Sequence, residues 1–168
     1  MVEEKNPVSA NRFSEVIAVK AKDIMKRDVI TVKPEATIRE IATILIENKI
    51  SGVPVVDAGG KLVGIVTEGD LLYKENNPRI PEYINILGAI IYYRGVERYN
   101  EDFKKLMAGT ASEIMTAKTI VVSEEESIEK IASLMIQHDI KRIPVVKGDQ
   151  VIGIISRADI IQTLLSEH

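Results

Sequence analysis

The stretch AKDIMKRDVITVKPEATIREIATILIENKISGVPVV, residues 21–56, occurs twice in this chain. Its second copy, ASEIMTAKTIVVSEEESIEKIASLMIQHDIKRIPVV, spans residues 111–146 and aligns without a gap, with 14 of 36 positions identical. After a shortening by one residue, the ending LVGIVTEGDLL (62–72) aligns with VIGIISRADII (151–161). A repeat of this length predicts two copies of one structural unit.

Each copy predicts the element order β-α-β-β-α. The β-branched runs VITV (29–32) and TIVV (119–122) indicate a first strand. VPVVD and LVGIVT, joined by a turn that contains glycine, indicate two further strands. A final helix is expected to begin at Glu68 in the first copy and at Arg157 in the second.

The helix inside each copy is predicted from apolar residues at helical spacing. In the first copy it runs from Ile38 to about Asn48, and Thr37 with Glu40 forms a capping box at its start. In the second copy Ser127 is the cap, but Lys130 replaces the glutamate. We expect the apolar faces to consist of Ile38, Ile41, Ala42, Leu45 and Ile46, and of Ile128, Ile131, Ala132, Met135 and Ile136.

Composition narrows the class of protein. The 168 residues are 45% hydrophobic, mostly Ile and Val, which suits strands covered by helices. No apolar run approaches the roughly 18 residues that span a bilayer, and the first residues lack a signal-peptide core, so a cytoplasmic location is expected. The chain has no cysteine, and its two histidines, His138 and His168, are far apart. We therefore expect no metal site and no catalytic residues.

The residues between the copies, 74–110, predict a helical connector. NNPRIP (76–81) indicates a loop, and the following residues alternate apolar and charged at helical spacing. A second interpretation is that this segment makes a dimer contact, since an apolar patch outside the repeats needs a cover. The residues of that contact would be Ile84, Leu87, Ile91, Tyr92 and Tyr93.

The repeat resembles the CBS domain, named after cystathionine β-synthase. The motifs that carry the resemblance are the DIM and EIM openings (23–25 and 113–115), the strands around Pro54 and Pro144, and the Gly-Ile-[Val/Ile]-[Thr/Ser]-x-x-Asp endings. The resemblance implies an α/β (α+β) fold in which two CBS units pack about a pseudo-twofold axis and leave two clefts, an arrangement called a Bateman module. It also implies that the chain forms a homodimer. The implied division is an N-terminal segment (1–17), a first CBS domain (18–73), a helical insertion (74–110) and a second CBS domain (111–166).

The two endings carry the candidate site. From the residues alone, Thr67 and Ser156 are helix N-caps, and Asp70 and Asp159 favour the helix dipole. The resemblance implies a second role, in which each aspartate accepts hydrogen bonds from the two hydroxyls of a ribose. A carboxylate has two acceptor oxygens and matches such a diol, and capping and binding are compatible.

The resemblance also implies the remaining residues of each cleft. For the second, favoured cleft they are Ile120, Val121, Lys141, Arg142, Ile143, Pro144, Ser156, Arg157 and Asp159. For the first cleft they are Ile30, Thr31, Ser51, Gly52, Val53, Pro54, Thr67 and Asp70. The apolar members could equally be core residues, and Lys141 with Arg142 a solvated surface.

The two clefts differ in charge. Arg157, Lys141 and Arg142 accompany Asp159, whereas Glu68, Ser51 and Gly52 occupy the matching positions beside Asp70. The cations favour phosphate. We expect the second cleft to prefer AMP, ADP or ATP, and the first to be empty or to hold a ligand with little negative charge.

The sequence therefore predicts a regulatory module, not an enzyme, that binds adenosine-containing ligands without an obligatory cofactor. The ligands expected are AMP, ADP, ATP or a molecule like S-adenosylmethionine. Only about 20 residues precede the first copy and almost none follow the second, so we expect the regulated effector to be a separate protein. A scaffolding or nucleic-acid-linked pair without a small ligand is the alternative. The net charge of −3 and the absence of a phosphate-binding glycine–lysine motif argue against nucleic acid and against a nucleotide-cleaving enzyme.

Overall fold

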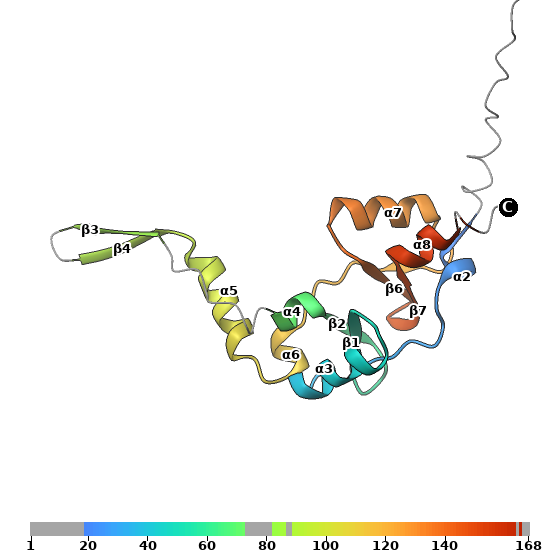
Figure 1. The fold of residues 1–168 in the computed structure, drawn as a ribbon, viewed down its shortest axis with the longest axis horizontal. Coiled ribbons are helices and arrows are strands. Elements are labelled where there is room, and N and C mark those ends of the chain that lie inside the picture. The colour runs from blue at the N-terminus through green and yellow to red at the C-terminus, as the bar shows by residue number, and fades with distance from the viewer. Residues whose placement is uncertain (1–18, 73–81, 87–88, 164, 166–168) are drawn as a thin grey trace, which may run out of the picture. The chain divides into compact units, whose positions relative to one another are not determined.

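The computed structural model describes residues 19–72, 82–86, 89–163 and 165 (Figure 1), without the side chains of residues 82–93, 98, 101–103 and 106. Its elements are α2 (Ala21–Ile24), α3 (Ile38–Glu47), β1 (Gly52–Val56), β2 (Leu62–Thr67), α4 (Glu68–Leu72), β3 (Glu82–Ile86), β4 (Ala89–Arg94), α5 (Val96–Met107), α6 (Ala111–Ile114), β5 (Val122–Ser123), α7 (Ile128–Gln137), β6 (Arg142–Lys147), β7 (Gln150–Ser156) and α8 (Arg157–Thr163). No described helix is both long and apolar enough to cross a bilayer.

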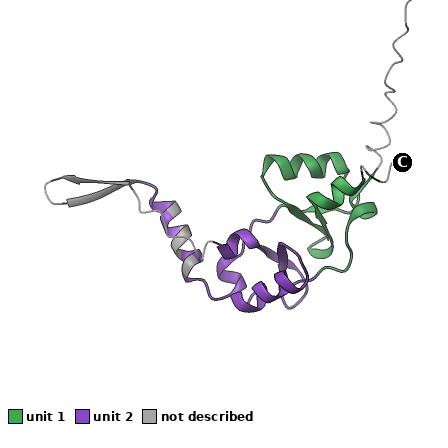
Figure 2. Ribbon diagram, viewed as in Figure 1, with its two compact units in different colours: residues 1–29, 120–168 green, residues 30–119 purple. Residues whose placement is uncertain are grey.

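The chain forms two compact units that cut across the sequence repeats (Figure 2). Unit 1 comprises residues 1–29 and 120–168, and unit 2 comprises residues 30–119. Each unit therefore joins the sheet and helices of one copy to the leading helical turn of the other copy, which is α2 in unit 1 and α6 in unit 2. The boundaries predicted from sequence describe the duplicated segments. As domain boundaries, they remain a prediction.

The leading segments join their units through main-chain hydrogen bonds at equivalent positions. In unit 1, the N–H of Ala21 donates to the carbonyl of Glu126 (2.8 Å), and Lys26 and Ile154 bond each other in both directions (3.0 Å each). In unit 2, the N–H of Ala111 donates to the carbonyl of Ala36 (2.8 Å). This pairing fixes each leading segment on the sheet of its unit.

The methionine of each opening motif packs against the glycine of an ending motif. A Cβ atom placed on Gly64 would lie 2.8 Å from Cγ of Met115, and one on Gly153 would lie 2.8 Å from Cγ of Met25. Both glycines are buried within strands, and real Cβ atoms do not approach other atoms so closely. Glycine is therefore required at these positions because the methionine occupies the place of a side chain.

The sheets follow the predicted order with shortened first strands. In unit 1, β5 pairs in parallel with β6, and β6 pairs antiparallel with β7. In unit 2, β1 and β2 are antiparallel, and the run VITV contributes only a single parallel bridge between Val32 and Val55. The next bond of that ladder would need an N–H at Pro54, and proline has none. Pro144 ends the ladder of β5 in the same way.

The inner helices begin where the caps predict. The N–H of Glu40 donates to Oγ1 of Thr37 (3.3 Å) and the N–H of Lys130 donates to Oγ of Ser127 (3.3 Å). The predicted apolar faces are correct for Ile38, Ile41, Leu45, Ile128, Ile131 and Met135, which are buried or pack against a core. Ile44 and Leu134 also pack against the cores and were missed, whereas Ala42 and Ala132 are only half-buried. Ile46 and Ile136 were wrong, since they are 77% and 78% exposed. Each follows a buried residue by about 100° of helical rotation and so points away from the core. The cores themselves contain Ile41, Leu45, Val53, Val55, Val66 and Ile114 in unit 2, and Met25, Ile131, Met135, Ile143, Val145 and Ile155 in unit 1.

The prediction of a wholly helical connector was wrong. β3 and β4 pair as an antiparallel hairpin, and only α5 is helical. The run YINILGAIIYYR is rich in Ile and Tyr, which favour strands, on both sides of a Leu-Gly pair. The proposed dimer contact lies outside the described side chains at Ile84, Ile91, Tyr92 and Tyr93, and outside the described residues altogether at Leu87.

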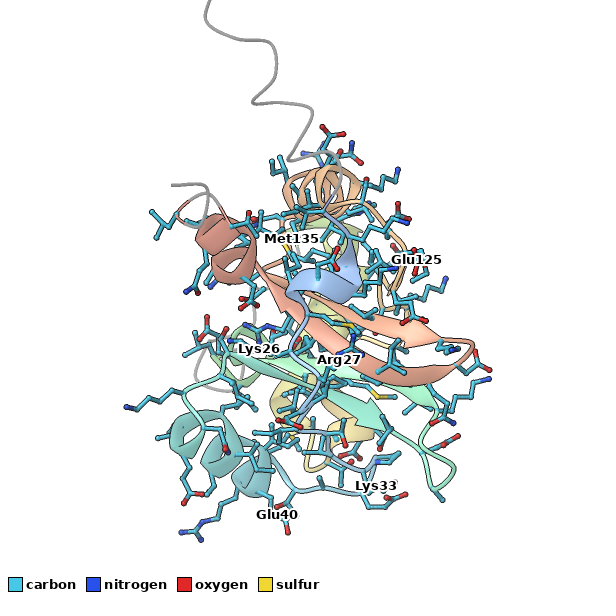
Figure 3. All side chains as sticks on the ribbon, turned by 90° about the vertical axis from the view of Figure 1, so that its right-hand side faces the viewer. Lys26, Arg27, Lys33, Glu40, Glu125 and Met135 are labelled. Atoms are coloured by element: carbon cyan, nitrogen blue, oxygen red, sulfur yellow. The ribbon has the colours of Figure 1, made fainter. Side chains whose placement is uncertain are left out.

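Glu125, which is labelled in Figure 3, pairs with two lysines of the leading segment. Its carboxylate oxygens lie 2.7 Å from Nζ of Lys20 and 2.6 Å from Nζ of Lys22. The hydrogen bond from Lys20, and then that from Lys22, lowers the pKa of Glu125 to about 2. Because this lies below the unfolded value of 4.5, the ionised pairs stabilise the fold above that pH, and their contribution declines as the pH falls from 4.5 toward 2.

We therefore expect Glu125→Gln to lower the melting temperature at pH 6 and to have a smaller effect as the pH is lowered toward 3. Melting curves of the variant and the parent across this range measure the difference. Glu47→Gln, at an exposed position at the end of α3, is the matched control. A difference for Glu125→Gln that stays constant across the range would contradict the assignment.

Candidate functional site

Asp159 stands at the start of α8, bound to the last residue of β7. Its Oδ2 accepts hydrogen bonds from the N–H (2.7 Å) and the hydroxyl (2.6 Å) of Ser156. The N–H of Asp159 donates in return to that hydroxyl (3.3 Å). The capping role predicted from sequence is therefore present, and it uses one carboxylate oxygen.

The other oxygen of Asp159 faces a lysine that the sequence did not indicate. Nζ of Lys26 lies 3.3 Å from Oδ1 of Asp159, and the lysine comes from the segment after α2 (Figure 3). Burial alone would raise the pKa of Asp159, but the hydrogen bonds from Ser156 and Lys26 together outweigh it and hold that pKa below its usual range. The carboxylate is consequently ionised at neutral pH.

Asp70 is capped in the same manner in unit 2. Its Oδ2 accepts hydrogen bonds from the N–H (2.9 Å) and the hydroxyl (2.8 Å) of Thr67. Its Oδ1 lies 2.6 Å from Nζ of Lys105, which comes from the last turn of α5. This cation comes from the segment between the repeats, so the comparison of equivalent repeat positions could not indicate it.

The structure brings several predicted residues of unit 1 to Ser156 and Asp159. Arg142 is directly opposite Ser156 in the strand register, and it is half-buried. Lys141 is exposed, and its carbonyl accepts a hydrogen bond from the N–H of Arg157 (2.9 Å). Ile143 and Pro144 are buried in the core, Ile120 packs against it, and Val121 is exposed.

The equivalent residues of unit 2 have the same places. Gly52 is opposite Thr67 in the register, and the carbonyl of Ser51 accepts a hydrogen bond from the N–H of Glu68 (2.9 Å). Val53 and Pro54 are fully buried, whereas Ile30 is exposed and Thr31 is half-buried. The core role that was open for Val53 and Ile143 is therefore present, and a contact with ligand stays a prediction for all of these residues.

Arg157 is directed away from Asp159 and toward the end of α7. Its Nε donates to the carbonyl of Ile140 (3.0 Å), and its Nη2 donates to the carbonyl of Met135 (3.2 Å) and to Oδ1 of Asp139 (3.0 Å). The guanidinium thus closes the C-terminal end of a helix, where a cation also favours the helix dipole. Its expected role as a phosphate-binding cation has no support in this geometry.

We expect Arg157→Met to lower the free energy of unfolding by about 1–2 kcal/mol, because hydrogen bonds from a charged group to the helix end are lost. Urea denaturation followed by circular dichroism measures the change. Arg157→Lys restores only part of the loss, since an ammonium cannot reach three acceptors in a fork. Equal stability of Arg157→Met and the parent would refute the helix-closing role.

The comparisons with known proteins agree with this architecture. The family model described as the CBS domain matches residues 21–76 and 111–166, which is two thirds of the chain. The chain belongs to the CBS domain family and carries two CBS domains in tandem.

Relatives of similar length and of greater length share this pair. The uncharacterized protein MJ1426 of Methanocaldococcus jannaschii is 32% identical over 86% of this chain and 90% of its own length. The CBS domain-containing protein CBSX1, chloroplastic, of Arabidopsis thaliana is 30% identical over 83% of this chain, which spans 61% of that relative.

Two solved structures share the fold. The CBS domain pair of protein MJ0100, in complex with 5′-methylthioadenosine and S-adenosyl-L-methionine, matches with a TM-score of 0.66 and 28% identity over 90% of this chain and 99% of that one. CBSX2 in complex with AMP matches with a TM-score of 0.67 and 24% identity over 88% of this chain and 96% of that one, a likeness of fold.

Proposed function

We propose that this chain is a regulatory module that binds an adenine nucleotide through the Asp159 site of unit 1 and passes the state of that site to a separate effector protein. The proposal extends to AMP, ADP and ATP, and it requires no cofactor and no catalytic residue. A cytoplasmic location is part of the same proposal.

The observation that carries the proposal is that the two carboxylate oxygens of Asp159 have different partners. Oδ2 accepts the two hydrogen bonds of the cap, whereas Oδ1 faces Nζ of Lys26 at 3.3 Å, and the side chain of that lysine is 69% exposed. An ionised carboxylate oxygen that faces an exposed lysine can accept hydrogen bonds from a ribose hydroxyl. A relative that is 28% identical, the MJ0100 pair, is in complex with two adenosine compounds, which supports this class of ligand.

The cations near Asp159 support a phosphorylated ligand. Lys26 faces the carboxylate directly, and Arg142 is beside Ser156 in the register. Lysine and arginine both bind phosphate oxygens through charge-assisted hydrogen bonds. We therefore expect AMP to bind more tightly than adenosine, and S-adenosylmethionine, which has a positive sulfonium in place of phosphate, to bind more weakly than either.

A thermal-shift screen tests the function. AMP, ADP, ATP, adenosine, S-adenosylmethionine and NAD are compared at equal concentration with the full chain. A ligand present at 100 times its Kd stabilises the folded state by about 2.7 kcal/mol, which is a shift of several degrees. If none of these compounds shifts the transition, the ligand-binding function is refuted and the scaffolding alternative is favoured.

We also propose that the chain forms a homodimer through the outer faces of its helices. Ile46 and Ile136 occupy equivalent positions and are 77% and 78% exposed, and Leu72 and Ile161 are 66% and 59% exposed. In unit 2, Ile46 and Leu72 line an apolar groove between α3 and α4. Such exposed apolar surface, present in both units, favours a protein interface.

Light scattering coupled to size-exclusion chromatography tests the dimer. The double variant Ile46→Glu/Ile136→Glu is expected to elute as a monomer, because it places a carboxylate on each of the two apolar surfaces. Thr43→Glu, at an exposed polar position of α3, is the control and should remain a dimer. A parent chain that elutes as a monomer would contradict the proposal.

A further inference from the structure

The aspartate of unit 2 is engaged on both of its oxygens. Oδ2 of Asp70 accepts two hydrogen bonds from Thr67, and Oδ1 lies 2.6 Å from Nζ of Lys105. The side chains of Asp70 and Lys105 are only 8% and 28% exposed. The ion pair is short and largely withdrawn from solvent, so water and salt screen it less than a surface pair.

The corresponding contact in unit 1 is looser. Lys26 approaches Asp159 only to 3.3 Å, and its side chain is 69% exposed. The two lysines also come from unrelated positions, since Lys26 follows α2, whereas Lys105 lies in the last turn of α5, within the segment between the repeats. The position of the repeat that matches Lys26 is Thr116. The tight pair in unit 2 is therefore a feature of the inserted segment and not of the duplication.

We propose that Lys105 is an internal competitor for the Asp70 site. A ribose diol needs Oδ1 of Asp70, since Oδ2 is saturated by Thr67, and Lys105 occupies that oxygen. An adenosine-type ligand must compete with the ammonium group for this oxygen, because the pair is shorter than the one in unit 1 and its lysine is much less exposed. This inference rests on the proposed function, because it assigns to Asp70 the same class of ligand as to Asp159.

The competition has a consequence for α5. The bond to Asp70 attaches the last turn of α5 to the start of α4, and the N–H of Ala108 extends that turn by donating to the carbonyl of Lys105 (3.3 Å). A ligand that displaces Lys105 removes this attachment. Occupancy of the Asp70 site is thereby communicated to the segment between the repeats, the part of the chain that the two CBS copies do not share.

Calorimetric titration with adenosine tests the competition. The Asp159→Asn substitution is made first in order to weaken binding at the site in unit 1. Adenosine is used because it has no phosphate that Lys105 could bind. The double variant Asp159→Asn/Lys105→Met should bind adenosine about 3- to 10-fold more tightly than Asp159→Asn alone, because a competing ion pair is removed. Lys104→Met, at the exposed neighbouring position, is the matched control and should change nothing.

Hydrogen exchange of α5 gives a second measurement, and its first comparison needs no ligand. Lys105→Met and Asp70→Asn should each raise exchange in the last turn of α5, and Lys104→Met should not. Adenosine added to the Asp159→Asn variant should raise exchange in the same turn.

The outcomes separate this inference from the proposed function. If the parent binds AMP but Lys105→Met does not tighten adenosine binding in the Asp159→Asn background, the competition is overturned and the function of unit 1 stands. If Lys105→Met weakens binding, Lys105 is a ligand contact and the competition is also overturned. If no variant and no parent binds any adenosine compound, both proposals fail.

Discussion

Asp159→Asn will weaken AMP binding by about 10- to 100-fold, the loss expected when one hydrogen bond to a charged acceptor disappears at roughly 1.5–3 kcal/mol. An amide has a single acceptor oxygen. If that oxygen caps Ser156, the group left for the ligand is an NH₂, which cannot accept a hydrogen bond from a ribose hydroxyl. The substitution therefore removes the proposed clamp while leaving the cap in place.

Two controls give this result its meaning. Asp70→Asn makes the same change in unit 2, where Lys105 already occupies the aspartate, and should alter AMP affinity by no more than about twofold. Urea denaturation should show that Asp159→Asn remains folded at the concentrations used for calorimetry. Unchanged AMP affinity in Asp159→Asn would remove the main support for the function of unit 1.

Gly153→Ala is expected to destabilise the fold by about 1–3 kcal/mol, the usual cost of adding a methyl group to a filled core. The new Cβ would lie 2.8 Å from Cγ of Met25, a residue that is 8% exposed. Met25→Ala alone should cost about 2–5 kcal/mol, because it removes a buried side chain and leaves a cavity. Each substitution thus damages the same contact from opposite sides.

The double variant distinguishes this contact from general damage. Met25→Ala/Gly153→Ala should be less destabilised than the sum of the single variants by at least about 1 kcal/mol, because the new methyl group enters the space that Met25 leaves. Gly69→Ala is the control, since a Cβ there would meet only Oγ1 of Thr67 at 3.5 Å. Additive effects in the Met25 and Gly153 pair would contradict the packing of the leading segment on unit 1.

The repeat made most of the fold predictable. The caps at Thr37 and Ser127 and the apolar spacing give α3 and α7 because these signals are local. The sequence did not predict that the leading helical turn of each copy packs on the sheet of the other copy. Met25 and Gly153 both appear in the family motifs, but their contact joins parts of the chain far apart in sequence, and no local pattern states which copy a segment packs on.

Local sequence patterns also failed to distinguish a helix from a β-hairpin in the segment between the repeats. The connector has apolar residues at spacings that fit a helix, but Ile and Tyr on both sides of Gly88 favour a hairpin, and the hairpin formed. β propensity depends on context, so the choice between the two needs the tertiary fold.

The candidate site was partly predictable for the same reasons. Thr67 with Asp70 and Ser156 with Asp159 are three residues apart, and their mutual hydrogen bonds follow from helix geometry. The direction of a long side chain does not follow from sequence. Arg157 therefore turned toward α7 instead of Asp159, and the lysines that do face the aspartates, Lys26 and Lys105, come from other elements.

The most direct test of the central claim is a crystal structure of the chain grown with AMP. The proposed function predicts a nucleotide at unit 1 with a ribose hydroxyl within hydrogen-bond distance of Oδ1 of Asp159, and its phosphate on Lys26 or Arg142. A nucleotide bound without contact to Asp159, or a chain that stays without ligand at saturating AMP, would contradict it.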